Sequence, residues 1–256
     1  MKTTVDKIKS MKGKEKIAML TAYDYFTSKM EDEVGMDIIL VGDSLGMVVL
    51  GYEGTTEVTM QDMVRHIGAV SRGAKNPLII GDMPIKSYDD NDSALKNAKL
   101  LLEAGADVVK IENKPEIAKF LVENKIDVME HIGLTPQTAT EFKVRGKDEE
   151  TANELISQAK ECEQAGCFSI VLEGMPRDLA KKITESISIP TMGIGAGPDC
   201  DGQVLVSNDM LGLYDKLSPK FVKKYADLGK DMKSAFENYV KEVKERKFPE
   251  DEHSFH

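Results

Sequence analysis

The fold of this chain is decided by the stretch Asp37-Ile-Ile-Leu-Val-Gly-Asp-Ser-Leu-Gly-Met47. Its apolar run, residues 38–41, has the length of a strand that is buried on both faces. The run stops at Gly42, and a carboxylate and a hydroxyl follow it in Asp43 and Ser44. A parallel α/β barrel opens the carboxyl ends of all its strands onto one face, where its active site lies. The stretch therefore predicts a buried strand that delivers polar groups to such a face.

The same arrangement, an apolar run with a polar residue at its end, recurs along the chain. Strands are expected at residues 16–21, 38–41, 78–82, 106–112, 126–131, 168–173, 189–193 and 202–206. Helical patterns separate most of them, at residues 25–34, 59–74, 93–104, 115–124, 151–164 and 179–187. Repeated βα units of this spacing indicate a parallel α/β fold, and a (β/α)8 TIM barrel typically has about 250 residues. We therefore expect such a barrel in this chain of 256 residues.

Two segments lie outside the eight units. Residues 3–15 predict a short N-terminal helix that caps the floor of the barrel. Residues 218–247 predict a charged amphipathic C-terminal helical region, and residues 248–256 form a tail. The apolar side of this region must pack on the barrel wall or on a neighbouring subunit. We expect residues 1–256 to form a single barrel domain that includes both segments.

Composition narrows the class of protein. The formal net charge of −10 argues against nucleic acid and anionic membranes as partners. No apolar stretch approaches the roughly 20 residues of a membrane span, and the N-terminal lysines have no apolar segment behind them, so no signal peptide is expected. Three cysteines in a chain of this length favour reduced thiols. We expect a cytoplasmic protein that acts on small molecules.

The predicted strand ends bring together several polar side chains: Asp43, Ser44, Asp82, Lys110, Glu112, His131 and Glu173. Several carboxylates beside one ammonium in a partly buried mouth favour a hard divalent cation. Mg²⁺ takes oxygen ligands and uses one or two protein carboxylates with waters and substrate oxygens. Asp43 and Asp82 follow neighbouring strands, so we expect them to be its ligands. Alternatives remain for single residues: helix caps for the aspartates, a structural ion pair for Lys110 with Glu112, and a core histidine for His131.

Such a site suits the chemistry of a 2-oxo acid. A metal ion chelated by the oxo acid would withdraw charge from the ketone and acidify the C–H on its far carbon. Glu173 could take that proton as general base, and Lys110 could stabilise the enolate oxygen. Glu112 could hold a metal-bound water or orient Lys110.

Several stretches point to one family. They are Val41-Gly-Asp-Ser-Leu-Gly-Met47, Gly81-Asp-Met-Pro84, Val109-Lys-Ile-Glu112, His131-Ile-Gly-Leu-Thr-Pro-Gln137 and Gly193-Ile-Gly-Ala-Gly197, in this order, with Phe248-Pro249 and His253-Ser-Phe255 near the end. With them the chain closely resembles the 3-methyl-2-oxobutanoate hydroxymethyltransferase, or ketopantoate hydroxymethyltransferase, family. The likeness runs from Met19-Leu-Thr-Ala-Tyr-Asp24 to the tail.

The resemblance implies a barrel of the phosphoenolpyruvate/pyruvate superfamily and Mg²⁺ dependence. It implies transfer of a hydroxymethyl group from 5,10-methylenetetrahydrofolate to 3-methyl-2-oxobutanoate. The product would be 2-dehydropantoate, on the route to pantothenate and coenzyme A. Family members assemble as homo-oligomers, often decamers, which implies the same for this chain.

The resemblance also implies roles for individual residues. Asp43 and Asp82 would bind the metal, and Glu112 would join them directly or through water. The oxo acid would contact Asp43, Ser44, Asp82 and Lys110, and we expect His131 to bind substrate as well. Glu173 matches the proton acceptor of the family.

Three local features depart from the family pattern. Glu141-Phe142 precedes Lys143 where the family has Gly-Gly-Tyr, Glu130 stands where a small residue is expected, and Asn113-Lys114 replaces glycines. These changes concern loops near the mouth and leave the metal and base positions intact. Two other functions stay open from the sequence: a Mg²⁺-dependent C–C lyase acting on a small 2-oxo acid, and a barrel that binds metabolites without catalysis.

Overall fold

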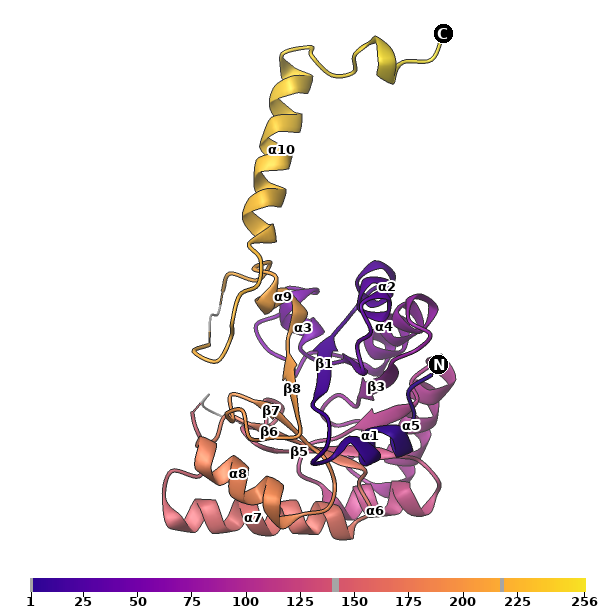
Figure 1. Cartoon of the computed structure of the whole chain (residues 1–256). Coiled ribbons are helices and arrows are strands. Elements are labelled where there is room, and N and C mark those ends of the chain that lie inside the picture. The colour runs from indigo at the N-terminus through magenta and orange to yellow at the C-terminus, as the bar shows by residue number, and fades with distance from the viewer. Residues whose placement is uncertain (1, 140–142, 217–218) are drawn as a thin grey trace. The chain divides into compact units, whose positions relative to one another are not determined.

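The computed structural model of the chain describes residues 2–139, 143–216 and 219–256. The chain forms two compact units, Met1–Val206 and Ser207–His256. In the first unit, eight parallel strands close into a barrel in sequence order, with helices packed around it (Figure 1). The strands are β1 (Ile17–Thr21), β2 (Ile38–Val41), β3 (Leu78–Asp82), β4 (Val108–Lys110), β5 (Val128–Gly133), β6 (Ser169–Glu173), β7 (Thr191–Ile194) and β8 (Gly202–Leu205). The predicted (β/α)8 barrel is confirmed, whereas the prediction of one domain over residues 1–256 stays a prediction.

Most strands lie where the sequence predicts them, and β2 and β3 match to the residue. The strand β2 is buried at all four positions, as its apolar run predicts. The strand β4 is shorter than the predicted 106–112. It ends early because the backbone N–H of Glu112 leaves the ladder and donates to the hydroxyl of Tyr88 at 3.3 Å.

Most helices of the first unit begin at capping side chains. They are α1 (Val5–Met11), α2 (Tyr25–Glu33), α3 (Leu45–Val48), α4 (Met60–Gly73), α5 (Asn91–Ala104), α6 (Pro115–Glu123), α7 (Glu149–Gln164) and α8 (Arg177–Ser186). Thr59 and Asp62 form a capping box at α4. Three helices start two residues before the predicted position: Asp90 caps α5, Asp148 caps α7, and α8 follows Pro176. The four-residue helix α3 is too short to show a helical period and was not expected.

Alternation along the strands separates two apolar cores. Ile38 and Leu40 of β2 belong to the cluster inside the barrel, while Ile39 and Val41 pack with the surrounding helices. The N-terminal helix α1 adds Ile8 and Met11 to the inner cluster. It therefore closes the floor of the barrel, as predicted.

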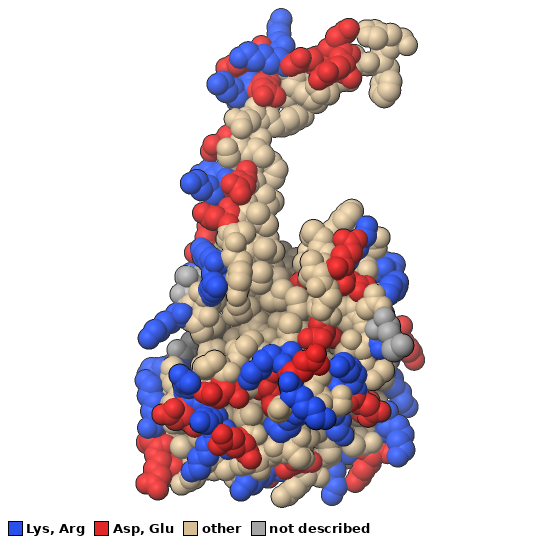
Figure 2. All heavy atoms as spheres, in the orientation of Figure 1, with Lys and Arg blue, Asp and Glu red and all other residues tan. Residues whose placement is uncertain are grey.

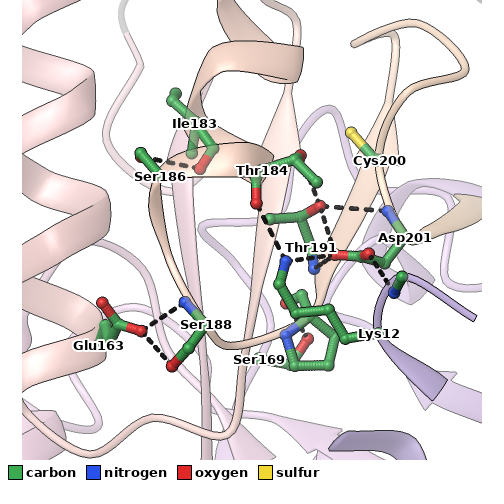
Figure 3. A network of polar contacts seen from close by, with 12 residues as sticks. Lys12, Glu163, Ser169, Ile183, Thr184, Ser186, Ser188, Thr191, Cys200 and Asp201 are labelled. Atoms are coloured by element: carbon green, nitrogen blue, oxygen red, sulfur yellow. Dashed lines mark hydrogen bonds and ion pairs between the residues drawn. The ribbon is translucent and has the colours of Figure 1, made fainter. Parts of the chain in front are cut away.

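A buried polar network joins this floor to the last strands of the barrel (Figure 3). Lys12 Nζ lies 2.8 Å from Asp201 Oδ2 and donates to the carbonyl of Thr184 at 3.0 Å. The same carboxylate oxygen accepts the backbone N–H of Thr191 at 3.0 Å, and the hydroxyls of Thr184 and Thr191 are 2.8 Å apart. Because these groups belong to segments far apart in sequence, the network ties the α1–β1 turn to β7 and α8.

The second unit contains α9 (Ser207–Met210), α10 (Leu228–Lys244) and the 3-10 turn η1 (Asp251–His253). Of the predicted helical region 218–247, Ser218 lies outside the described residues, and α10 covers only the later part. The prediction is wrong for residues 219–227, which are not helical, since the N–H of Tyr225 and that of Leu228 bond the carbonyls of Met210 and Leu211. None of the residues of α10 is buried. In Figure 2 its charged side chains gather along one side and leave the other uncharged.

Two further expectations concern the environment of the chain. Among the helices in the described ranges, none has the length and apolar character needed to cross a bilayer. Cys162, Cys167 and Cys200 are buried free thiols.

A buried acid in α2 makes the stability of the fold depend on pH. Glu31 is 6% exposed, and its Oε2 has no hydrogen-bond partner among the described residues. Burial, and then the charge of Asp24, raises the pKa of Glu31 from the ordinary 4.5 to about 8. Between these values the folded protein keeps a proton that the unfolded chain has released, so the free energy of unfolding falls as pH rises.

Glu31→Gln is expected to remove this dependence, because the amide cannot ionise. Keeping Glu31 protonated at pH 7 costs the wild type roughly 3 kcal/mol at about 1.4 kcal/mol per pKa unit. The melting temperature of the variant should therefore exceed that of the wild type increasingly between pH 5 and pH 8. Glu33→Gln, at an exposed position of the same helix, is the control. Parallel melting curves for the wild type and Glu31→Gln across this range would contradict the assignment.

Candidate active site

The candidate site occupies the carboxyl ends of β2 to β6. On four of these strands an apolar side chain of the inner cluster lies two residues before a polar one, which puts both on the inward face. The pairs are Ile80 with Asp82, Val108 with Lys110, Met129 with His131, and Val171 with Glu173. The apolar layer inside the barrel thus lies beneath a group of polar side chains at the carboxyl ends of the strands. We call this end of the barrel the mouth, and all the predicted site residues lie around it.

Lys110 is the centre of the charged groups. Its Nζ donates to both carboxylate oxygens of Asp82, at 2.9 and 3.0 Å, and lies 3.8 Å from Glu112 Oε1. Burial by itself would lower the pKa of Lys110, but Asp82, Glu112 and Asp43 together hold it well above its ordinary value. The raised pKa favours the charged form of Lys110, which is suited to stabilise negative charge.

His131 joins the two remaining carboxylates. Its Nδ1 lies 3.2 Å from Glu112 Oε1, and its Nε2 lies 3.2 Å from Glu173 Oε2, at ion-pair distance but without hydrogen-bond geometry. Burial opposes protonation, but Glu112 and Glu173 outweigh it and raise the pKa of His131 to about 9. Burial by itself would raise the pKa of Glu112. The charge of His131, with that of Lys110, outweighs burial and holds the pKa of Glu112 below its ordinary value. Glu173 is the carboxylate of this group with access to solvent, at 14% side-chain exposure.

Asp43 and Ser44 complete the set from the end of β2. The backbone N–H of Asp43 donates to Asp82 Oδ2 at 3.3 Å, so the two aspartates are direct neighbours. Burial, and then the charge of Asp82, raises the pKa of Asp43 well above its ordinary value. The hydroxyl of Ser44 lies 2.8 Å from that of Tyr23, which follows β1.

Two residues of the site, Gln137 and Tyr88, were not singled out from the sequence. Gln137, in the loop after β5, donates its side-chain amide to Asp43 Oδ2 and to the carbonyl of Met83, both at 2.9 Å. Its backbone N–H donates to Glu112 Oε2 at 3.1 Å, and its amide oxygen accepts the hydroxyl of Tyr88. Gln137 therefore links the carboxylates of β2 and β4. Its place in a quoted family stretch was the available signal, since a glutamine in a loop has no periodic pattern.

A divalent cation fits the residues present. Within the described ranges, no group of three His, Cys, Asp or Glu side chains is already arranged around a metal position. Mg²⁺, however, needs only one or two protein carboxylates and completes its shell with water and substrate. Asp43 and Asp82 are adjacent, 5% and 2% exposed, and both have a raised pKa, for which burial is the largest cause. A cation between them would remove the repulsion between two buried negative charges.

Comparison with known proteins identifies the family. The model of the family described as ketopantoate hydroxymethyltransferase matches residues 2–251. The chain belongs to the ketopantoate hydroxymethyltransferase family. It is accordingly a transferase.

Relatives of this family match over the whole chain. A 3-methyl-2-oxobutanoate hydroxymethyltransferase of Clostridium novyi (strain NT) is 54% identical, with 100% of this chain and 96% of the relative covered. A protein of the same name from Enterococcus faecalis is 53% identical over the same shares.

Solved structures support the fold. The structure of 2,3-dimethylmalate lyase, a PEP mutase/isocitrate lyase superfamily member, matches with a TM-score of 0.63 at 12% identity, covering 100% of this chain and 93% of that one. Phosphonopyruvate hydrolase, solved with oxalate and Mg²⁺, matches with a TM-score of 0.62 at 12% identity, covering 98% and 93%. These likenesses confirm the barrel fold.

Two departures from the family pattern contact each other in this structure. The fully buried carboxylate of Glu130 accepts the backbone N–H of Lys114 at 3.0 Å and that of His131 at 3.1 Å. Asn113 has a left-handed φ of 48°, a conformation that glycine adopts readily and asparagine tolerates. Glu130 therefore holds the loop that follows Glu112. The third departure, Glu141-Phe142, lies outside the described residues.

Gln137→Leu is expected to weaken both the site and the fold. The substitution leaves Asp43, the Met83 carbonyl and the Tyr88 hydroxyl without a buried partner, and each such group costs about 1–3 kcal/mol. We expect the free energy of unfolding, measured in urea, to fall by several kcal/mol on this basis, and turnover to fall with it. The same change at Gln164, which is exposed at the end of α7, is the control. Equal stability of the two variants would show that the Gln137 contacts are dispensable.

Proposed function

We propose that this protein transfers a hydroxymethyl group from 5,10-methylenetetrahydrofolate to 3-methyl-2-oxobutanoate. The product is 2-dehydropantoate, an intermediate on the route to pantothenate and coenzyme A. Membership of the family and the names of relatives at 53–54% identity support the substrate and the product. The observation that carries the proposal is the meeting of Asp43, Asp82, Lys110, Glu112 and Glu173 at one end of the barrel.

The oxo acid is proposed to bind over Asp43, Ser44, Asp82 and Lys110. Mg²⁺ would be held by Asp43 and Asp82, with Glu112 in direct contact or through water, and when bound it would polarise the ketone and acidify the adjacent C–H. The side-chain amide of Gln137 orients Asp43 by donating a hydrogen bond to its Oδ2 at 2.9 Å. His131, which lies between Glu112 and Glu173, is proposed to contact substrate as well.

The proton at C3 of the oxo acid is proposed to pass to Glu173. The side chain of Glu173 is 14% exposed, against 2–5% for Asp82, Lys110, Glu112 and His131. It can therefore meet a substrate that enters from solvent. Its Oε2 lies 3.2 Å from His131 Nε2, so the imidazole ring helps to position the carboxylate.

Lys110 is proposed to stabilise the oxygen that becomes negative as this proton leaves. An ammonium has three N–H donors, and Asp82 accepts two of them. The third can be directed at the enolate oxygen, in a buried site where such a contact is strong. Water adds to the methylene carbon of the donor and breaks its two C–N bonds, which releases tetrahydrofolate and leaves that carbon at the oxidation level of formaldehyde. The enolate carbon forms the new C–C bond to it, and the proton held by Glu173 passes to the resulting alkoxide oxygen.

The test supplies purified protein with 3-methyl-2-oxobutanoate, 5,10-methylenetetrahydrofolate and Mg²⁺, and measures 2-dehydropantoate. Folded, metal-loaded protein that makes no product would reject the proposal. Turnover of the oxo acid without folate would favour the Mg²⁺-dependent C–C lyase. Binding of the acid without exchange of its C3 proton would favour a barrel that does not catalyse.

We also propose that the enzyme works in the cytoplasm as a homo-oligomer, decameric as in the family resemblance. The support is the apolar side of the second unit, where Met232, Phe236 and Tyr239 of α10 are 47–62% exposed. Such a row of exposed apolar groups is typical of a protein interface. The molar mass in solution, measured by light scattering, tests this.

A further inference from the structure

A cavity opens beside the charged mouth, between the loop that follows β5 and the first half of α7. Its volume is about 310 Å³, which falls in the range of about 300–1,000 Å³ typical of small-molecule sites. Its wall carries two basic side chains, Lys143 and Arg145, with the hydroxyls of Thr135 and Thr138. None of these residues has a role in the chemistry proposed above.

The cavity shares its inner wall with the strands that carry the reacting groups. Gly133, at the end of β5, lines it with a φ of 99°, and a Cβ there would lie 2.2 Å from the carbonyl oxygen of Glu173. Asn113, also in the wall, follows Glu112 directly and donates its N–H to the carbonyl of His131 at 3.1 Å. A ligand in the cavity would thus contact the backbone segments that lie next to Glu173 and Glu112.

The charges of the wall favour an anion. The guanidinium of Arg145 has no ion pair among the described residues, while its backbone N–H donates to the carbonyl of Gly174 at 2.8 Å. Among the described residues of the wall, the acidic side chain is Glu154, which accepts a hydrogen bond from Gln158 at 3.1 Å. A fixed backbone with an uncommitted guanidinium is suited to bind a carboxylate in two parallel hydrogen bonds.

The same wall has an apolar part. Leu134 and Leu155 line the cavity and are 8% and 5% exposed. The ligand that fits combines a flat apolar body with a terminal carboxylate. A reduced folate meets this description, since it ends in a benzoyl-glutamate group.

We propose that this cavity binds the benzoyl-glutamate end of the reduced-folate donor, with Arg145 and Lys143 facing the glutamate carboxylates and Leu134 and Leu155 packing on the ring. The inference rests on the proposed function, since that function supplies the folate. It places the methylene carbon of the donor toward the mouth and the glutamate toward solvent.

The test compares two ligands and needs no turnover. Tetrahydrofolate and tetrahydropteroate, which lacks the glutamate, are titrated into the holoenzyme with Mg²⁺ and oxo acid present. We expect the wild type to bind tetrahydrofolate at least about tenfold more tightly, the usual effect of a charge-assisted contact. Arg145→Met and the double variant with Lys143→Met should bring the ratio close to one. Lys147→Met removes an exposed cation of the same loop that does not line the cavity, and it should keep the wild-type ratio.

Equal affinity of the wild type for both ligands, or a ratio that survives in the double variant, would overturn the inference, as would failure to bind tetrahydrofolate. The outcome is separate from the proposed transfer. A protein that shows the ratio but makes no 2-dehydropantoate keeps the folate site and loses the proposed function. A protein that makes 2-dehydropantoate while Arg145→Met leaves the ratio intact keeps the function and loses this site.

Discussion

Asp82→Asn is expected to lower turnover by about 10³-fold, since loss of this proposed metal ligand would withdraw several kcal/mol of transition-state stabilisation by the metal. The substitution also removes the negative charge that balances Lys110, whose Nζ contacts both oxygens of Asp82. Breaking a buried ion pair costs about 3–5 kcal/mol, so the melting temperature should fall as well. Turnover and Mg²⁺ affinity, measured by calorimetry with the oxo acid present, check the two effects.

Asp89→Asn provides the matched control for this variant, because Asp89 is exposed in the loop after β3. It should leave Mg²⁺ affinity and melting temperature at wild-type values. If Asp82→Asn loses stability but binds Mg²⁺ as tightly as the wild type, Asp82 serves only as the partner of Lys110. The assignment of Asp82 as a metal ligand would then be wrong.

Glu173→Gln is expected to slow the exchange of the C3 proton of the oxo acid by about 10²–10⁴-fold, the usual contribution of a positioned general base. The amide keeps the size of the side chain but cannot accept a proton at neutral pH. Binding of the oxo acid should persist, because the proposed substrate contacts lie on the other strands. Deuterium incorporation at C3 in D₂O, followed by NMR without folate, measures the effect.

Glu185→Gln, at an exposed position of α8, should exchange the proton at the wild-type rate. Two outcomes would count against Glu173 as the base. The first is wild-type exchange in Glu173→Gln, and the second is loss of oxo-acid affinity in proportion to the loss of exchange. The second result would assign Glu173 to binding.

Strand positions could be predicted from the sequence because they depend on local chemistry. The run 38–41 is too apolar to be exposed and too short to be a helix, and the structure places β2 at those residues. The pairing of Thr59 with Asp62 marks the start of α4 in the same way. Prediction was less accurate where tertiary contacts end an element, as at β4, where the hydroxyl of Tyr88 takes the N–H of Glu112.

The residues of the mouth were predictable for a related reason. In a parallel barrel every strand ends on the same face, so a polar residue that follows an apolar run points to that face wherever the run lies in the chain. This rule found Asp82, Lys110 and Glu173 without any knowledge of distances. It says nothing about a side chain that reaches the mouth from a loop.

The sequence by itself determined the barrel, the order of its strands and the charged groups at their ends, because hydrophobic period and strand direction are properties of short segments. Only the tertiary structure decided that Gln137 holds Asp43 while its backbone holds Glu112, and that Glu130 anchors the loop after Glu112. It also decided that Arg145 lies in the wall of a cavity beside Glu173. Such contacts join loops whose positions depend on the packing of the whole barrel, and no local pattern encodes them.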